Sequence, residues 1–312
     1  MTHHGKKRGV KRLKKNMCYK MRWMRFNGYS GWSSCGQCLE CRQAKAREWG
    51  LRNSFEADTT TEGCFITLTY DEEHNPIVLI KKHLQDFKKR LRRYVEGGKA
   101  LNGRKIRTFD CGEYGDKNYR PHFHMLIHGF DFPDKYEIKK SDKGYPIYNS
   151  EKLEKIWGKG LVTVQDMTMN AAAYCARYSA KPTKFLPAHL QEHPEFNTFS
   201  KSLGTAEMLK KIDTYLETDE IYYDGKKFRI PQCVLNKRFE AVIEARRLRR
   251  SGVDIPVTED EKRYVALKEA RIRKSEQHMD ACIRKHKGNF VKYLDERRYV
   301  KENADKRLQK KL

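Results

Sequence analysis

The chain has 312 residues and a formal net charge of +25, because 66 Lys and Arg residues face only 41 Asp and Glu residues. Hydrophobic residues make up 38% of it, less than in an ordinary soluble domain, so we expect part of the chain to lie outside a compact core. So basic a protein indicates a polyanionic partner, above all nucleic acid, since each phosphate contact releases condensed counterions. A solvated basic surface without a specific partner is the alternative. A peripheral membrane protein is disfavoured, because no stretch combines Lys and Arg with a wide face of Trp, Phe and Leu.

The amino-terminal residues and the cysteines indicate the compartment. The segment from Met1 to Asn16 is basic and is followed by no apolar run, so no secretory signal is expected. The nine cysteines are an odd number and are unevenly spread, with three of them at Cys35, Cys38 and Cys41. In a protein that is not exported, this pattern favours free thiols or a metal site over disulfides. We therefore expect a reducing cytoplasm.

Helices and strands are predicted in chain order from periodicity and propensity. Residues 1 to 34 are basic, with little periodic signal. The run from Cys35 to Ala57 begins with a Gly turn and continues with Ala, Lys, Arg and Glu, which predicts a helix. Further along, strands are predicted at Cys64–Tyr70, Ile106–Tyr114, His122–His128 and Leu161–Gln165. Helices are predicted at Ile80–Val95, at Asn170–Lys181 before Pro182, and in two charged runs beyond Lys237 that are joined through Gly252 to Pro256.

These elements predict three regions. Residues 1–57 form a basic segment with a Cys-x-x-Cys-x-x-Cys knuckle and a helix, residues 58–236 the main domain, and residues 237–312 a basic helical extension. The cluster from Gly115 to Asn118 has turn chemistry, which makes the strands on either side of it a hairpin with a long loop. The predicted fold class is α+β, with a central antiparallel β-sheet and flanking helices.

The segment from Arg120 to His128 carries the sharpest chemical signal. Alternate side chains of a strand point to the same face, so His122 and His124 emerge together while Phe123 faces the core. Two imidazoles held close together on a rigid element are a natural pair of metal ligands.

Glu113 is the expected third ligand. It lies near the end of the preceding strand, and the hairpin can bring its carboxylate across from the histidines. Two imidazoles and one carboxylate leave positions open on a divalent ion for water and substrate oxygens. A His-x-His pattern alone is more often a pair of surface or hydrogen-bonded residues, and Glu113 is what favours a metal site. His128 shares the parity of the pair but lies further along the strand, so it is left out.

A second signal lies in the helix predicted at residues 170–181. Tyr174 and Tyr178 are four residues apart and share a helix face, with Lys181 a further turn along. A phenol ionises near pH 10 unaided, so a nucleophilic tyrosine needs help. A metal that polarises a phosphate and a Lys that stabilises developing negative charge would supply it. The alternative is that both tyrosines only pack the helix against the sheet, which is the commoner explanation for an isolated Tyr-x-x-x-Tyr.

The order of these features resembles the HUH endonuclease superfamily, which is named for its histidine pair. Within it, the sequence is most similar to replication initiation proteins of gokushovirus-like microviruses, which are small single-stranded DNA bacteriophages. The similar stretches run from Cys35 to Gly204 and read CGQCLECRQAKAREW, FITLTY, CGEYGDKNYRPHFHMLIHG, IWGKGLVTV, AAAYCARYSAKP and FNTFSKSLG. They cover a little over half of the chain, and an HUH, Rep-like fold is expected from them.

The resemblance implies that the protein nicks single-stranded origin DNA to start rolling-circle replication. The two histidines and Glu113 would hold Mg²⁺ or Mn²⁺ against the scissile phosphate. Tyr174 or Tyr178 would attack the phosphorus, leaving a 5′-phosphotyrosine and a free 3′-hydroxyl, and the other tyrosine would later release a unit-length circle. Lys181 would assist near the metal or the leaving oxygen. The implied partners are single-stranded viral DNA with its origin and a host helicase and polymerase, with no membrane, and the implied location is the host bacterial cytoplasm.

The clustered cysteines suit a structural metal. The spacing of Cys35, Cys38 and Cys41 fits soft-metal ligation, and Cys18 would supply the fourth thiolate for a structural Zn²⁺. Three thiols without a metal are the alternative.

Two other functions fit part of the sequence. A non-enzymatic zinc-knuckle protein that binds nucleic acid would explain the charge, but not why Glu113, the histidine pair and the tyrosine pair follow in this order. Metal-dependent nicking distinguishes the two. A plasmid relaxase or a transposase of the same superfamily is the other alternative. Transposases usually carry one tyrosine and relaxases often place their histidines after it, whereas here two tyrosines follow the histidines.

Overall fold

The computed structural model describes the backbone of residues 18, 21–26, 29–36, 38–97, 105–115, 118–142, 144–167, 186–285, 288–289, 291–292, 294–296 and 298–299. By their contacts, the residues fall into two compact units, Met1–Ala44 with Arg271–Leu312, and Lys45–Ala270. The domain boundaries expected at residues 57 and 236 stay a prediction.

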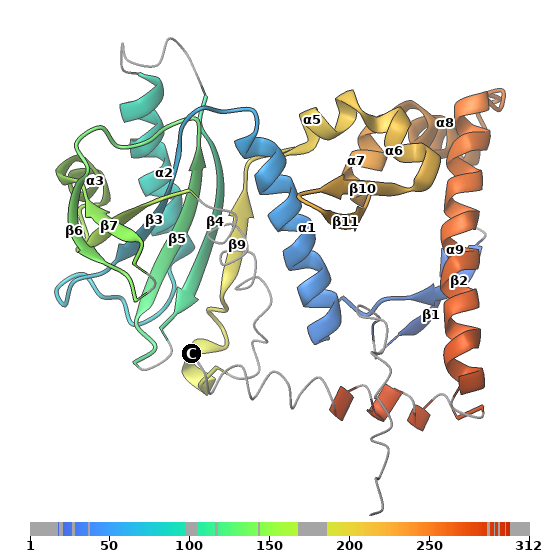
Figure 1. Ribbon diagram of the computed structural model, residues 1–312, viewed down its shortest axis with the longest axis horizontal. Helices are drawn as coiled ribbons and strands as arrows, with labels where there is room; N and C mark the ends of the chain where they lie inside the picture. Colours follow the sequence, from blue (N-terminus) through green and yellow to red (C-terminus); the bar gives the residue numbers. More distant parts are fainter. Residues whose placement is uncertain are drawn as a thin grey trace, which may run out of the picture. The chain divides into compact units, whose positions relative to one another are not determined.

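The larger unit is built on a seven-stranded sheet with the order β6-β7-β8-β3-β5-β4-β9, in which every described strand pair is antiparallel (Figure 1). Its strands are β3 (Gly63–Thr69), β4 (Arg107–Tyr114), β5 (Pro121–His128), β6 (Tyr136–Lys140), β7 (Pro146–Asn149), β8 (Val162–Asp166) and β9 (Phe196–Phe199). The predicted α+β class, with a central antiparallel sheet, flanking helices and a basic carboxy-terminal helix, is confirmed.

One face of the sheet is covered by the helices α2 (Lys81–Glu96) and α3 (Glu151–Trp157) (Figure 1). The alternate β3 residues Cys64, Ile66 and Leu68 are all fully buried on this face. Helix α2 meets them with apolar side chains three and four residues apart, the spacing of an amphipathic helix: Leu84, Phe87, Leu91 and Val95. This cluster is the main core of the larger unit.

The opposite face packs against α1 (Leu39–Ala57). The ring centroids of Trp49 on α1 and Phe109 on β4 are 4.9 Å apart, and both rings belong to a buried cluster with Leu126 of β5. Because side chains alternate along β5, His124 shares this face with Leu126. The predicted ligand histidines therefore lie on the α1 side of the sheet.

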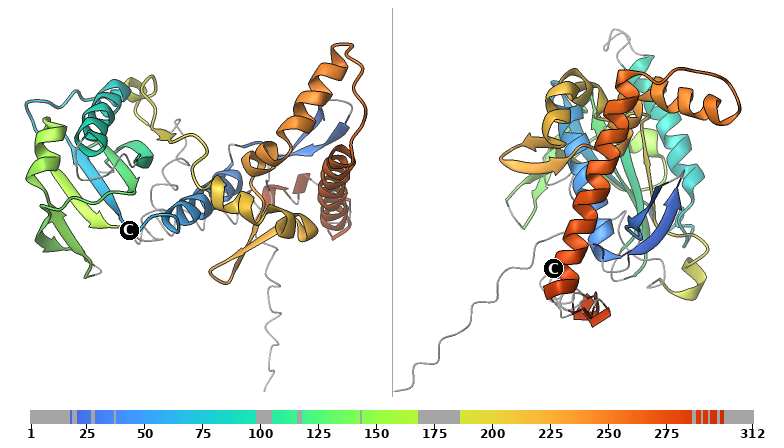
Figure 2. Two further views of the ribbon diagram at one scale, coloured as in Figure 1. Left: turned by 90° about the horizontal axis from the view of Figure 1, so that it is seen from above. Right: turned by 90° about the vertical axis from the view of Figure 1, so that its right-hand side faces the viewer.

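A third apolar cluster follows β9 in the chain. Its elements are α5 (Thr205–Lys210), α6 (Ile212–Thr218), β10 (Glu220–Tyr223), β11 (Lys226–Arg229), α7 (Gln232–Arg238) and α8 (Glu240–Arg250) (Figure 2). Their buried side chains pack against Leu51 and Phe55 of α1. Helix α1 thus contributes to two cores, one facing the sheet and one facing this helical group.

The smaller unit contains an antiparallel hairpin of β1 (Arg22–Phe26) and β2 (Tyr29–Ser33) and the later residues of α9 (Glu259–Lys285). Met279 of α9 is 1% exposed and is packed by Met21, Trp32 and Leu294. The side chains of Trp23 and Trp32 meet edge to face with centroids 5.5 Å apart.

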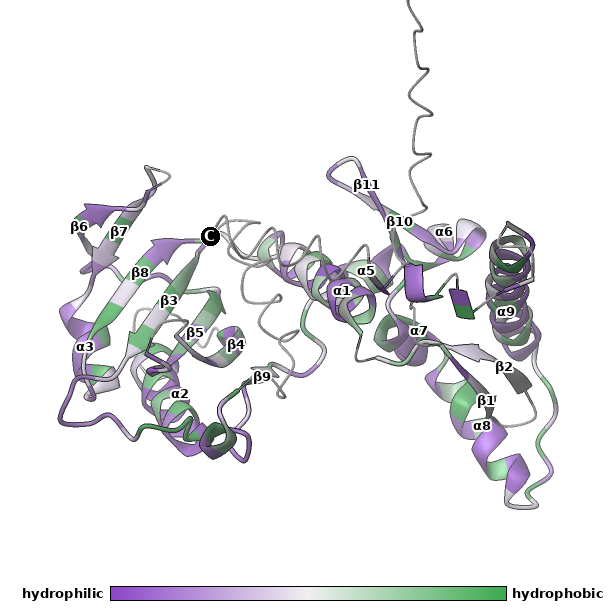
Figure 3. Ribbon diagram, turned by 90° about the horizontal axis from the view of Figure 1, so that it is seen from below, coloured by the Kyte–Doolittle hydropathy of each residue, from purple (hydrophilic) through white to green (hydrophobic). Residues whose placement is uncertain are grey.

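Most predicted elements are present. The four predicted strands are β3, β4, β5 and β8, and predicted helices correspond to α1, α2, α8 and α9. The helix expected at residues 170–181 lies outside the described residues. The hairpins β1–β2, β6–β7 and β10–β11 were not predicted, and Figure 3 shows β6 and β11 largely hydrophilic, so they lack an apolar alternation. Among the described residues, no helix has both the length and the apolar character that crossing a membrane requires.

Two glycines with nearly the same backbone allow a test of packing between α1 and the segment after β9. Gly204 has φ +66° and an added Cβ would overlap the carbonyl of Arg52, whereas Gly225 has φ +64° with open space around it. We expect Gly225→Ala to lower the free energy of unfolding by about 1 kcal/mol, the cost of a left-handed Ala. Gly204→Ala should lower it by about 3 kcal/mol, because overpacking is added. Urea unfolding followed by circular dichroism measures both, and equal losses would contradict the described contact.

Candidate functional site

The first candidate site lies at the centre of the sheet, where β4 and β5 form a hairpin. Its connection is closed by hydrogen bonds of 3.0 Å from Gly115 N–H to the Arg120 carbonyl and from Tyr119 N–H to the Gly115 carbonyl. The resulting register sets Glu113 directly opposite His122. The predicted hairpin therefore brings the carboxylate to the histidines, as the sequence suggested.

The three side chains form one group. Potential ligand atoms of Glu113, His122 and His124 all lie within 4.8 Å of one another. Oε1 of Glu113 is 2.6 Å from Nε2 of His122 and 3.0 Å from Nε2 of His124. Phe123, between the histidines, is fully buried in the core on the other face, as alternation requires.

The remaining ring nitrogens are held by neighbouring groups. Nδ1 of His122 lies 3.1 Å from the carbonyl of Arg120, and Nδ1 of His124 lies 2.9 Å from the hydroxyl of Thr67. A carbonyl can only accept, so Nδ1 of His122 carries the proton of this hydrogen bond. In the neutral ring, Nε2 then presents a lone pair to a carboxylate oxygen, and two acceptors this close require a shared cation, either a second proton or a metal.

Burial and charge favour a cation at the carboxylate. The side chain of Glu113 is 4% exposed, and its second oxygen, Oε2, is buried without a hydrogen-bond partner among the described residues. Burial alone would raise the pKa of Glu113, but hydrogen bonds with His122 and His124 outweigh it and lower the pKa. The group is therefore an ionised carboxylate with an unused oxygen beside two imidazoles. This donor set fits a divalent ion such as Mg²⁺ or Mn²⁺.

His128 is not part of the group. It shares the strand face of the ligand histidines, but it is 1% exposed and its Nε2 lies 3.0 Å from Oδ1 of Asn53 on α1. Burial, and next the charge of Arg107, lower the pKa of His128 to about 4. It is a neutral core residue that joins β5 to α1.

Two contributors to the site were not predicted. Phe65 stacks on His124 with ring centroids 5.4 Å apart and planes 9° from parallel, and Thr67 binds the same ring. Both lie on β3, whose register pairs Thr67 with His124. The alternation of the FITLTY run contains this signal, because Phe65 and Thr67 share one strand face.

The predicted nucleophiles lie outside the described residues. Tyr174, Tyr178 and Lys181 all fall in residues 168–185. Their place relative to the group formed by Glu113 and the two histidines stays a prediction.

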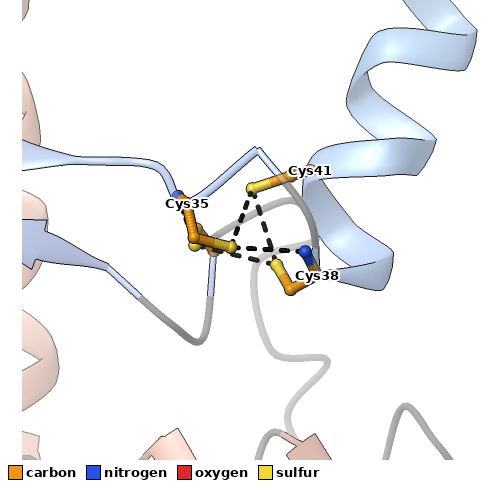
Figure 4. A group of neighbouring side chains, drawn as sticks. Cys35, Cys38 and Cys41 are labelled. Carbon is orange, nitrogen blue, oxygen red and sulfur yellow. Dashed lines mark hydrogen bonds between the residues drawn. The ribbon is translucent and has the colours of Figure 1, made fainter. Parts of the chain in front are cut away.

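The second candidate site is the cysteine cluster of the smaller unit. Cys35, Cys38 and Cys41 lie together where α1 begins (Figure 4), and Cys18 belongs to the same group, with all four sulfurs within 4.8 Å of one another. The sulfur–sulfur distances are 3.5 Å for Cys38–Cys41, 3.7 Å for Cys38–Cys18 and 4.0 Å for Cys35–Cys41. A disulfide needs about 2.05 Å, so these sulfurs are not bonded to each other.

The separations fit tetrahedral zinc. Four sulfurs at about 2.3 Å from a zinc ion are about 3.8 Å apart, because a tetrahedron's edge is ~1.63 times its centre-to-corner distance. The backbone N–H groups of Cys35 and Cys38 donate to the sulfurs of Cys18 and Cys35 at 3.3 and 3.2 Å. Hydrogen bonds with Cys18 and Cys38, together with burial, raise the pKa of Cys41, so the clustered thiols resist ionisation unless a cation balances them.

The comparisons with known proteins fall on the sheet and its triad. Residues 63–183 match the model of the ORF2 family of replication-associated proteins, a stretch that begins with β3 and includes both predicted tyrosines. No solved structure matches the chain.

Three curated proteins of small viruses are similar in sequence. "Replication-associated protein ORF2" of Spiroplasma virus 4 is 30% identical over 59% of this chain and 61% of its own length. "Replication-associated protein ORF4" of Chlamydia phage 1 is 31% identical over 61% and 49%. "Replication-associated protein VP4" of Bdellovibrio phage phiMH2K is 36% identical over 50% and 50%.

These matches confirm the resemblance that the motifs indicated. The chain is similar to replication-associated proteins of phages, and the similarity includes all three residues of the candidate metal group. The alignments span about half to three fifths of the length of these relatives, 61%, 49% and 50%.

The buried His128 predicts a pH dependence of stability. Its pKa of about 4 in the folded protein is below the ordinary value near 6.5, so the unfolded chain binds a proton that the folded chain rejects between these values. Stability should therefore fall as the pH drops through this window. Between pH 7 and pH 4, we expect wild type to lose about 3 kcal/mol more unfolding free energy than His128→Gln. Urea titrations across this range measure the difference, and parallel pH profiles would contradict the assignment.

Proposed function

We propose that the protein is a replication initiator that nicks single-stranded origin DNA and becomes attached to the 5′ end of the cut. The observation that supports this most is the group formed by Glu113, His122 and His124, in which a buried carboxylate oxygen without a partner among the described residues accompanies two imidazoles. The group lies within residues similar to phage replication-associated proteins. A site of this kind suits phosphate chemistry on nucleic acid.

Glu113 and the two histidines would hold Mg²⁺ or Mn²⁺, with the carboxylate charge and two neutral nitrogens as ligands. A bound ion of this kind polarises a phosphate and stabilises the charge that develops on it. Thr67 and the Arg120 carbonyl keep the imidazoles oriented, which is the usual task of groups behind metal ligands.

Tyr174 or Tyr178 would be the nucleophile. In the proposed step, the phenol oxygen forms a bond to phosphorus while the bond from phosphorus to the 3′-oxygen breaks. The phenol loses its proton, and the leaving 3′-oxygen ends as a hydroxyl. One phosphodiester replaces another, so no energy source is needed. Lys181 would stabilise negative charge on the reacting oxygens.

The proposed product determines the partners. A free 3′-hydroxyl is a primer, so a host polymerase would extend it and a host helicase would separate the strands. The net charge of +25 favours binding to single-stranded viral DNA. The host bacterial cytoplasm is the place where these partners meet.

We further propose that Cys18, Cys35, Cys38 and Cys41 hold a structural Zn²⁺. The support is their four-sulfur grouping with separations near those of a zinc tetrahedron. Closure by four protein thiolates leaves no open position, which is typical of structural zinc. The cluster and the charge also suit a nucleic-acid-binding protein without enzymatic activity, which is the competing function.

Nicking is tested with labelled single-stranded DNA from a phage origin region, Mn²⁺ and denaturing gels. Wild type should form a protein–DNA adduct that survives denaturation and is lost with a chelator. The double variant of Tyr174→Phe with Tyr178→Phe should form none, while Tyr215→Phe on α6 should behave as wild type. His124→Ala should slow cutting by at least about 100-fold, because a ligand is lost.

The single tyrosine variants show which phenol attacks first. Strong DNA binding by wild type without any cut or adduct on linear or circular viral strands would favour the binding-protein function instead. An adduct that persists in the double variant would overturn the proposed nucleophiles while leaving the metal group in place.

Zinc is tested by elemental analysis of protein purified without chelator. We expect about one zinc per chain in wild type, since four thiolates form one closed site. Cys38→Ser should lose it, whereas Cys233→Ser, a half-buried cysteine of α7, should keep it. Substoichiometric zinc in wild type, or equal zinc in both variants, would contradict the proposed site.

A further inference from the structure

A cavity of about 380 Å³ lies at the amino-terminal end of β5, next to the candidate metal group. Three separate segments line it, residues 75–77, 118–121 and 189–190. Its volume is near the small end of ligand pockets, which span about 300–1,000 Å³. A nucleoside fits this size and a double helix does not.

The walls of the cavity are fixed to one another by Tyr114. Its hydroxyl accepts the Leu79 N–H at 2.9 Å and donates to the His193 carbonyl at 2.9 Å. These two residues flank the first and third walls, and Tyr114 itself is 2% exposed. The cavity is therefore preformed by a buried hydrogen-bonded link.

The cavity is also connected to the candidate metal group. Arg120 lines it, and the carbonyl of Arg120 accepts the hydrogen bond from Nδ1 of His122. Tyr114, which fixes the walls, directly follows the ligand Glu113 in β4. A strand of DNA held at the metal would thus have the cavity within reach of a neighbouring nucleotide.

Two residues of the lining combine backbone strain with exposure. Ile77 has φ 64° and Tyr119 has φ 50°, both in the left-handed region that β-branched and bulky residues rarely adopt. Their side chains are 66% and 41% exposed, so burial does not account for these residue types. Backbone strain of this kind gathers at sites that bind ligands.

The chemistry of the lining suits a nucleobase. Tyr119 offers a ring face, and Ile77 and Leu190 offer apolar surface. The Asn75 oxygen accepts the Ile77 N–H at 3.2 Å, and its NH₂ group and the Asn118 amide have no partner in the described part of the chain. None of the lining residues is acidic, which disfavours a second cation site. The Arg120 guanidinium is paired with Glu72, so a free phosphate lacks an unpaired guanidinium here.

We propose that this cavity is a nucleobase subsite for single-stranded DNA, in which Tyr119 stacks on a base and the amides of Asn75 and Asn118 bind its edge. The proposal rests on the proposed function, because it places the base next to the phosphate that is cut. Stacking on an aromatic ring accepts any base, and the two amides add preference for one.

The test measures binding of fluorescein-labelled oligothymidylate and of a mixed-sequence strand by anisotropy, in EDTA and at one salt concentration. Tyr119→Ala keeps the Cβ and the backbone but removes the ring, and should weaken binding about tenfold. Tyr119→Phe and Tyr119→Trp keep a ring and should bind within about twofold of wild type. The matched control is Tyr136→Ala, which removes a tyrosine that is 50% exposed at the opposite edge of the sheet.

A second measurement does not depend on how the variants fold. Strands carrying 5-iodouracil are photo-crosslinked to wild type, and the attached peptide is identified by mass spectrometry. Crosslinks at residues 75–77 or 118–121 support the subsite, and crosslinks only elsewhere overturn it. Wild-type binding by Tyr119→Ala, or an equal loss in Tyr119→Phe, also overturns it.

The outcomes separate the subsite from the proposed function. Both measurements are made without a divalent ion and need no cutting. Ring-dependent binding in a protein that never nicks DNA would leave the subsite and reject the nuclease. Nicking that is insensitive to the ring at position 119, with crosslinks elsewhere, would leave the nuclease and reject the subsite.

Discussion

The register of β4 against β5 is the constraint on which the candidate site depends. It pairs Glu113 with His122 and Cys111 with His124, so the carboxylate and both imidazoles share one face. Side chains alternate with a period of two, so a slip by one residue would move the histidines to the other face. The apolar side chains on both faces oppose such a slip. Phe123, fully buried among the residues that α2 and α3 cover, and Leu126, buried near Trp49, would both have to change sides.

Much of the site could be predicted from the sequence because it is local. The two histidines are separated by one residue and Glu113 by a short connection, so alternation and a turn were enough to bring them together. Phe65 and Thr67 come from β3, and their partnership with His124 depends on which strands are neighbours. Pairing between distant strands leaves no local pattern, which is why these two residues were missed.

Other features could not be predicted for different physical reasons. The β10–β11 hairpin is largely exposed, so its sequence lacks the alternation that identifies a strand. The cavity joins three segments far apart in the chain, and only the folded protein places Ile77 near Tyr119. The place of Cys18 beside the three clustered cysteines was inferred from residue type and is a geometric fact of the structure, whereas the metal it would bind stays a proposal.

Neighbouring positions in β4 divide two tasks between the two faces of one strand. Glu113 faces the histidines, and Tyr114 faces the core on the other side and fixes the walls of the cavity. The side chains that line the cavity belong to connecting segments, which tolerate change better than strands do. Under the proposed function, recognition of bases could therefore diverge between related phages through substitutions at positions such as 75, 77, 118 and 119. The cutting chemistry would stay the same, because the strands that hold the metal ligands would not have to change.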